Sequence, residues 1–219
     1  MDSFDPEPIL PEPLVAGRRA IHPEDHEAWG YLRERLGDQV LRCASYFELD
    51  EALPGYVVIR FPGEDFWQAR TIQGKMYKNK PGIAKPIFRH IVPGRRFLFV
   101  CEGVFDALCS GNGVALLGKA VGPSAVARVV AALGECGDDV VPVAALDPSE
   151  RQKSEALARS ISATGLVSRV GILNYDGLDG DLGNLKCDGY NELLPRIELM
   201  GHSAAELSPL KKIKGIPHN

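Results

Sequence analysis

The stretch Arg96-Phe-Leu-Phe-Val-Cys-Glu-Gly-Val-Phe-Asp-Ala-Leu-Cys-Ser-Gly-Asn-Gly-Val-Ala-Leu-Leu-Gly118 decides the fold class. Its apolar run, Phe97 to Cys101, has the length and composition of a strand buried on both faces, as in a parallel sheet. The run stops at Glu102, residues 104–109 predict a short helix, and residues 114–117 predict the next strand. A strand, an acidic turn, a helix and a second strand form a βαβ unit, so we expect an α/β protein.

Two acids lie where this unit turns from strand to helix. Glu102 follows the carboxyl end of the strand, where ligands bind in open α/β sheets. Asp106 lies in the first turn of the helix, where exposed backbone amides favour a negative charge. The same positions also suit a solvated loop acid and an ordinary helix-start residue. Acids at the ends of other strands would favour the functional interpretation.

Two later segments repeat this pattern. Residues 140–146 predict a strand that ends at Asp147, residues 150–164 predict a helix, and residues 166–173 predict another strand. Asp188 follows that strand, at the start of a final helix. Three acidic positions therefore follow successive strands of a predicted parallel sheet. Hard oxygen ligands of this kind suit a magnesium site for phosphoryl or nucleotidyl transfer.

Other metal and disulfide sites are not expected. Residues 174–183 are rich in Asp and Gly, but they lack the closing Glu of an EF-hand, and Asp-Gly turns are ordinary. The five cysteines contain no Cys-x-x-Cys pair, and the five histidines show no ligand spacing. The sequence therefore predicts neither a calcium loop nor a zinc site nor a disulfide framework.

The composition is that of a globular chain with one main domain and a smaller piece: 219 residues, 45% hydrophobic and 25% charged. No apolar run is as long as a membrane helix, and the amino terminus is acidic and Pro-rich, unlike a signal peptide. We therefore expect a cytoplasmic protein with no membrane partner. The net charge of -4 does not exclude nucleic acid, because local clusters of Lys and Arg matter more than the total.

A smaller basic region precedes the βαβ unit. Residues 23–37 have helical spacing, and residues 56–61 and 66–72 predict two strands joined by a Pro-Gly turn. Cations then occur with almost no acids among them: Arg70, Lys75, Lys78, Lys80, Lys85, Arg89, Arg95 and Arg96. Such a loop, which also contains Tyr77 and several Gly and Pro residues, suits a phosphate backbone or a nucleoside triphosphate. An ordinary solvated loop is the alternative.

The order of the acids resembles the TOPRIM domain, which DnaG-type primases share with type IA and type II topoisomerases and certain nucleases. The resemblance covers about residues 56–194. Residues 100–108 are similar to the primase Glu-Gly-x-x-Asp-Ala signature, and Asp147-Pro-Ser149 falls where the family has Asp-x-Asp. Residues 186–194 are similar to the third segment of phage members. Tyr77-x-Asn79-x-Pro81-Gly82 resembles the basic amino-terminal subdomain of the primase core, which the topoisomerases and nucleases lack.

The resemblance implies a Rossmann-like, mostly parallel sheet with helices on both faces, preceded by a small basic α+β subdomain. The expected divisions of the chain are an extended or disordered arm at 1–22, the basic subdomain at 23–95, the TOPRIM domain at 96–200 and a tail at 201–219.

The function implied by the resemblance is that of a phage-type DNA primase core in the cytoplasm of a bacterial host cell. It would make short RNA primers for DNA replication by metal-dependent nucleotidyl transfer. Glu102, Asp106 and Asp147 would be catalytic, and Glu102, Asp147 and Asp188 would bind magnesium or manganese. Single-stranded DNA template and ribonucleoside triphosphates would contact Arg70, Lys75, Tyr77, Lys78, Asn79, Lys80 and Lys85.

Some features differ from a complete primase. Ser149 stands where the family has its second Asp, so one metal ligand is missing unless Glu150 or a water replaces it. The chain shows neither a zinc ribbon nor a helicase, so a separate zinc-binding subunit and a replicative helicase are the expected partners. One alternative is a catalytically impaired TOPRIM protein that binds single-stranded DNA or a replication protein. Another is a TOPRIM nuclease, which the absence of its typical partner modules disfavours.

Overall fold

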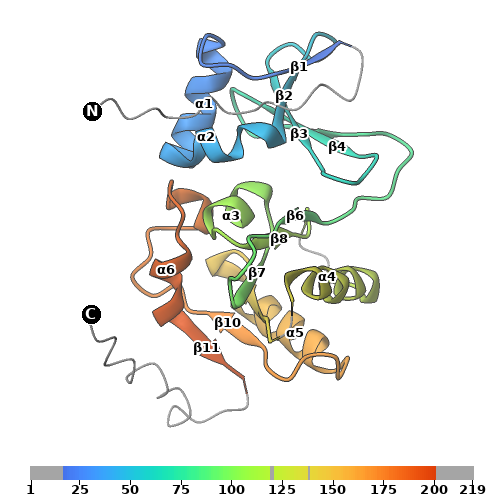
Figure 1. Ribbon diagram of the computed structural model, residues 1–219, viewed down its shortest axis with the longest axis vertical. Coiled ribbons are helices and arrows are strands. Elements are labelled where there is room, and N and C mark those ends of the chain that lie inside the picture. Colours follow the sequence, from blue (N-terminus) through green and yellow to red (C-terminus); the bar gives the residue numbers. More distant parts are fainter. Residues whose placement is uncertain (1–16, 119–120, 138, 201–219) are drawn as a thin grey trace, which may run out of the picture.

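The computed structural model describes residues 17–118, 121–137 and 139–200, and it contains two β-sheets with associated helices (Figure 1). The α/β class expected from the sequence is confirmed. No helix of the described residues is long and apolar enough to cross a membrane. The expected tail at 201–219 and most of the expected arm, residues 1–16, lie outside the described residues.

The amino-terminal sheet is antiparallel, with its five strands in the order β1-β2-β3-β4-β5. The elements of this half are β1 (Arg18–Ala20), α1 (His26–Leu36), α2 (Val40–Cys43), β2 (Phe47–Asp50), β3 (Tyr56–Arg60), β4 (Trp67–Thr71) and β5 (Tyr77–Asn79). The strands expected at 56–61 and 66–72 are β3 and β4. Residues 18–20, expected within the arm, instead form strand β1, which pairs with β2.

The second sheet is mixed, with the strand order β11-β10-β9-β7-β8-β6. Its parallel strands are β7 (Phe97–Cys101), β8 (Gly113–Ala115), β9 (Val141–Ala145) and β10 (Gly171–Leu173). The edge strands β6 (Phe88–His90) and β11 (Ile197–Leu199) are antiparallel to their neighbours. Because β6 pairs with β8, residues 88–90 belong to this sheet although they precede the boundary expected at residue 95. The parallel strands end at one common edge.

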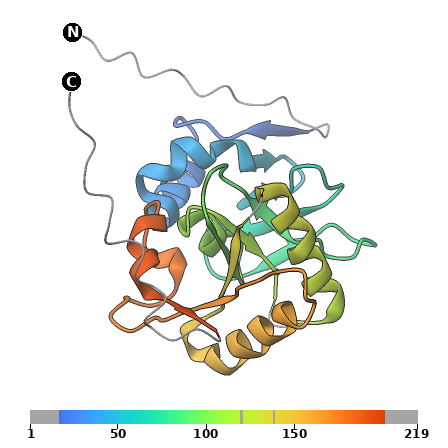
Figure 2. The same cartoon turned by 60° about the horizontal axis from the view of Figure 1, so that its bottom comes forward.

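Helices cover both faces of the second sheet. They are α3 (Val104–Cys109), α4 (Pro123–Cys136), α5 (Arg151–Ser162) and α6 (Tyr190–Leu193). Along β7, Phe99 and Cys101 face one buried cluster, which includes residues of α1, α3 and α6, while Leu98 and Val100 face another, which includes residues of α4 and α5. Figure 2 shows α4 and α5 on one side of the central strands and the red α6 on the other. This alternation explains the continuous apolar run in the sequence.

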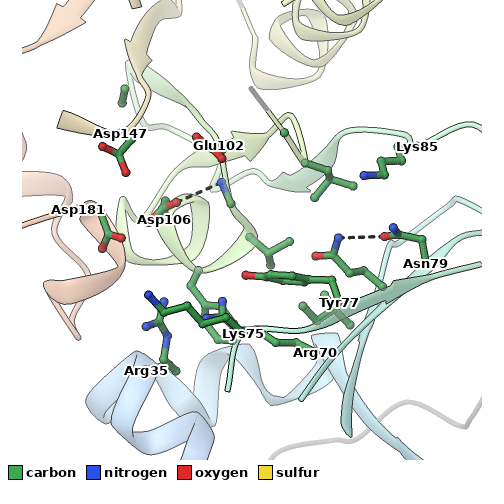
Figure 3. Close-up of a pocket in the computed structure, with 18 of the residues that line it drawn as sticks. Arg35, Arg70, Lys75, Tyr77, Asn79, Lys85, Glu102, Asp106, Asp147 and Asp181 are labelled. Carbon is green, nitrogen blue, oxygen red and sulfur yellow. Dashed lines mark hydrogen bonds between the residues drawn. The ribbon is translucent and has the colours of Figure 1, made fainter. Parts of the chain in front are cut away.

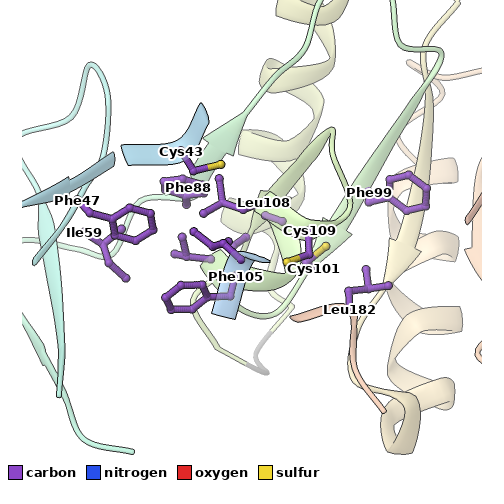
Figure 4. Packing of buried hydrophobic residues seen from close by; sticks show 14 of the residues in the cluster. Cys43, Phe47, Ile59, Phe88, Phe99, Cys101, Phe105, Leu108, Cys109 and Leu182 are labelled. Carbon is purple, nitrogen blue, oxygen red and sulfur yellow. The ribbon is translucent and has the colours of Figure 1, made fainter. Parts of the chain in front are cut away.

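One hydrophobic core joins the two sheets. Phe47 and Ile59 of the amino-terminal sheet pack in the same buried cluster as Phe88, Phe105 and Leu108 of the second half (Figure 4). The rings of Phe47 and Phe105 stack with their centroids 5.8 Å apart. Burying one such side chain stabilises the folded state by about 1.5–3 kcal/mol. The core therefore fixes the start of α3 relative to strands β3–β5.

Candidate functional site

A cavity of 640 Å³ lies between the amino-terminal sheet and the edge where the parallel strands end (Figure 3). Residues that follow each of these strands line it: Glu102 after β7, Leu117 after β8, Asp147 after β9 and Tyr175 after β10. The opposite wall comes from β3, β4, β5 and the adjoining loops. The volume is within the range of about 300–1,000 Å³ that is usual for small-molecule sites.

Four acids line this cavity: Glu102, Asp106, Asp147 and Asp181. Figure 3 shows their carboxylates gathered on one side, with Tyr77, Asn79 and Lys85 on the other. The sequence predicted the strand-end positions of Glu102 and Asp147. Asp181 was missed, because its Asp/Gly-rich segment suggested only a calcium loop, which its spacing did not support.

Asp106 connects α3 to the loop that carries Asp181. Its Oδ2 accepts a hydrogen bond from the Gly103 N–H (3.1 Å), and its Oδ1 accepts one from the Gly183 N–H (2.8 Å). Burial, followed by the negative charge of Asp181, raises the pKa of Asp106 from 3.8 to about 6. Asp106 therefore holds the loop of Asp181 in place. Burial and the neighbouring acid both disfavour the ionised form of Asp106.

Asp147 is oriented by the turn that follows β9. The Ser149 hydroxyl donates to Asp147 Oδ1 (2.6 Å), and the Ser149 N–H donates to the same oxygen (2.9 Å). The turn itself is a single 3₁₀ segment, Pro148–Glu150. The serine at the position of the expected second Asp therefore fixes the side chain of the first one.

The cavity acids offer only oxygen ligands, which suit Mg²⁺ or Mn²⁺. Asp181 Oδ1 is buried and has no hydrogen-bond partner among the described residues. A Cβ atom at Gly183 would lie 3.1 Å from Arg35 Nη2, 3.1 Å from Asp106 Oδ1 and 3.3 Å from Asp181 Oδ1, so a side chain at this position would crowd one arginine and two acids. Nevertheless, no three Asp, Glu, His or Cys side chains of the described residues form a group that could hold a metal ion. The fit to a hard divalent cation therefore depends on the donor chemistry and on the unpartnered oxygen of Asp181.

Asp188 does not line this cavity, and the expectation that it lies with Glu102 and Asp147 is wrong. Its two carboxylate oxygens accept hydrogen bonds from Arg95 at 2.8 and 2.6 Å. Arg95 precedes β7 whereas Glu102 follows it, so Asp188 lies at the opposite end of a strand that spans roughly 16 Å. The hydrogen bonds from Arg95 hold the pKa of Asp188 below its usual value.

The residues predicted to bind nucleic acid or nucleotide divide into those that line the cavity and those that do not. Arg70, Lys75, Tyr77, Asn79 and Lys85 line the cavity. Lys78 and Lys80 do not line it, because successive side chains of a strand point to opposite faces.

The excluded lysines have partners elsewhere. The ammonium of Lys78 lies 4.5 Å from the centre of the Tyr56 ring, and Lys80 forms an ion pair with Asp65. The sequence showed a basic segment but not which of its residues share a face.

Two arginines border the acids, and the sequence pointed to only one of them. The guanidinium of Arg70 lies 5.0 Å from the Tyr77 ring centre and 5.4 Å from that of Phe105, while that of Arg35 lies 4.9 Å from Phe105. The Nε atoms of both arginines are buried without a hydrogen-bond partner among the described residues. Arg35 lies in the last turn of α1 and had no sequence signal beyond its helical position. These stacked cations suit the binding of phosphate groups.

Neither a protein-family model nor a curated protein matches this chain. We therefore infer a function from the residues that line the cavity.

Proposed function

We propose that the chain is the catalytic core of a DNA primase, with a TOPRIM-type, Rossmann-like second domain. In this proposal it makes short RNA primers from ribonucleoside triphosphates on a single-stranded DNA template. One observation carries the proposal: acids that follow neighbouring parallel strands line the same cavity as the cations and aromatic residue of the preceding sheet. Nucleotidyl transfer needs both sets, because a charged triphosphate and two nucleic-acid strands must meet at one place.

The acids would hold the metal. Glu102 and Asp147 are the proposed ligands for magnesium or manganese, with Asp181 taking the place that the sequence had suggested for Asp188. A bound divalent cation offsets phosphate charge and favours ionisation of a hydroxyl nucleophile. Ser149 orients Asp147, and Asp106 holds the loop that brings Asp181 to the cavity.

The cations would hold the phosphates. Arg70, Lys75 and Lys85 reach the cavity from the amino-terminal sheet and its loops, and Arg35 reaches it from α1. They would align the triphosphate while the 3′ hydroxyl of the primer attacks the α-phosphorus. The new oxygen–phosphorus bond forms as the bond to pyrophosphate breaks, and the hydroxyl proton is released. Alignment of the two reactants lowers the barrier because it removes their freedom to move apart.

A priming assay tests this function. The protein is incubated with single-stranded DNA, labelled ribonucleoside triphosphates and Mg²⁺ or Mn²⁺, with and without added helicase. The expected products are short, template-dependent RNA chains. Glu102→Gln should remove them, and Asp188→Asn serves as the matched acid outside the cavity. Absence of product from the native protein, or undiminished synthesis by Glu102→Gln, would count against the proposal.

A second candidate is a TOPRIM-derived protein that binds single-stranded DNA or a replication protein without catalysis. It is favoured by Ser149, which stands at the position where a second Asp is expected. Titration calorimetry with Mn²⁺ separates the two candidates. A primase should bind the metal, and Asp147→Asn should weaken that binding. A non-catalytic binding protein should show no heat of metal binding that depends on Asp147.

A further inference from the structure

The cavity wall opposite the acids carries a pair of side-chain amides. Gln68 of β4 and Asn79 of β5 are directly opposite each other in the sheet, and both line the cavity. The Gln68 Nε2 donates a hydrogen bond to Asn79 Oδ1 (3.0 Å). Gln68 is only 7% exposed, so its amide is nearly removed from bulk water. Burying polar groups in this way is unfavourable unless they are hydrogen-bonded.

The hydrogen bond between the amides uses one donor and one acceptor. Each amide has both a carbonyl oxygen and an NH₂ group, so Gln68 Oε1 and Asn79 Nδ2 can serve a third partner. An acceptor beside a donor matches the edge of a nucleobase, where an N–H group lies next to a ring nitrogen or a carbonyl oxygen. The wall therefore offers polar groups suited to a base edge.

An aromatic surface lies beside the amides. Tyr77 is two residues before Asn79 on β5, on the same face of the sheet, and it is 49% exposed. Across the strand pair, Arg70 is opposite Tyr77 and places its guanidinium 5.0 Å from the centre of the ring. Nucleobases stack on exposed aromatic rings of this kind. The amide edge and the stacking ring thus belong to one face.

We propose that this wall holds the nucleobase of a bound ribonucleoside triphosphate. The base stacks on Tyr77, and its edge hydrogen-bonds to Gln68 Oε1 and Asn79 Nδ2. The triphosphate extends from there toward Lys75, Lys85 and the acids. The identity of the ligand rests on the proposed function. The protein itself thus contacts the base, before any template base pairs with it.

Titration calorimetry without DNA tests this inference. ATP and inorganic tripolyphosphate are compared in the same Mg²⁺ buffer, since tripolyphosphate has the phosphates but no base. ATP should bind at least about tenfold more tightly, because stacking and hydrogen bonds to the base add to the phosphate contacts. GTP, CTP and UTP extend the comparison to the other base edges. Equal affinity for ATP and tripolyphosphate would overturn the inference.

Substitutions assign the effect to this wall. The double variant Gln68→Leu/Asn79→Leu replaces both amides with side chains of similar size, which is the change least disruptive to a paired site. It should bind ATP about tenfold more weakly while its affinity for tripolyphosphate stays the same. Tyr77→Ala should act in the same direction, and it provides a test at an exposed position if the double variant does not fold. Lys78→Ala, on the opposite face of β5, is the matched control and should leave both affinities unchanged. Native-like ATP binding by the folded amide and tyrosine variants would contradict the assignment.

The test of the base subsite and the test of primase activity can fail independently. A protein that prefers ATP to tripolyphosphate but makes no RNA has the base subsite without primase activity. A protein that makes RNA but binds ATP no better than tripolyphosphate is a primase without this subsite. If neither compound binds, the base subsite is refuted, while the priming assay still decides the function.

Discussion

The acids at the two ends of the parallel sheet have opposite electrostatic surroundings. At the amino end, Asp188 receives two hydrogen bonds from Arg95, which lower its pKa. At the carboxyl end, burial and then the charge of Asp181 raise the pKa of Asp106, and Asp181 has a buried oxygen without a hydrogen-bond partner in the described structure. The first arrangement stabilises the fold as it stands. The second brings two acids together beside the guanidinium of Arg35, which offsets part of their repulsion, and a bound cation would offset more of it.

The largest expected effect separates these two ends by activity. Glu102→Gln or Asp147→Asn should lower RNA synthesis at least about 100-fold, because each change removes a proposed metal ligand. Asp188→Asn should retain synthesis, since its partner Arg95 lies at the other end of β7. Initial rates of primer synthesis on single-stranded DNA measure the difference. Equal losses in all three variants would show that the two ends do not differ in function.

The second expected effect is that Asp106 and Asp188 make the free energy of unfolding depend on pH in opposite directions. Urea unfolding of wild type, Asp106→Asn and Asp188→Asn without metal measures both contributions. The folded pKa of Asp106 is raised to about 6, so stability from this residue is greatest below pH 3.8 and is lost as the pH rises through 6. The loss relative to Asp106→Asn should be on the order of 1–3 kcal/mol.

Asp188 should show the reverse behaviour in the same experiment. Its folded pKa is lowered, so the stability that it contributes is present above pH 3.8 and is lost as the pH falls further. Asp188→Asn should therefore be less stable than wild type at pH 7, and the two should converge in acid. If the stability difference between wild type and variant changed with pH in the same direction for both variants, the contrast between the two ends would be wrong.

The sequence predicted the carboxyl end of the sheet better than the path of the chain beyond it. The apolar run of β7 and the turn at Glu102 are local features, and the same holds for β9 and Asp147, so these acids could be placed from strand ends alone. The segment after β10 instead crosses to the amino end of the sheet. There the Tyr190 hydroxyl accepts from the Phe97 N–H, a contact between residues far apart in the chain that no local pattern specifies.

Strand pairing limited the prediction in the same way. Only Gly171–Leu173 of the strand expected at 166–173 pairs in the sheet, as β10 between β9 and β11. Strand β5 was not predicted, so the sequence could not assign Lys78 and Asn79 to different faces. Asp181 and Arg35 were missed because their approach to Asp106 depends on how α1 and the loop after β10 pack against α3. Local sequence patterns thus placed two acids at strand ends, whereas tertiary packing determines which residues line the cavity.

A third expected effect concerns metal affinity. Asp181→Asn should weaken Mn²⁺ or Mg²⁺ binding about tenfold, because it removes the charge of an acid whose oxygen is unpartnered in the cavity. Asp188→Asn should bind the metal as wild type does, since that acid is already engaged by Arg95. Titration calorimetry measures both, with unfolding curves as a check that each variant is folded. Unchanged affinity in Asp181→Asn would remove this residue from the proposed ligand set.

The smallest expected effect compares the two faces of the basic segment. Lys85 lines the cavity, whereas Lys78 lies against Tyr56 on the other face of the sheet. If single-stranded DNA enters through the cavity, Lys85→Ala should weaken its binding a few-fold and should reduce the slope of log affinity against log salt by about 0.7, the value for one phosphate contact with a single strand. Lys78→Ala should change neither quantity. Fluorescence anisotropy with a labelled oligonucleotide at several salt concentrations measures both. Equal reductions in the slope would mean that the nucleic acid contacts both faces, because counterion release counts the phosphates contacted wherever they lie.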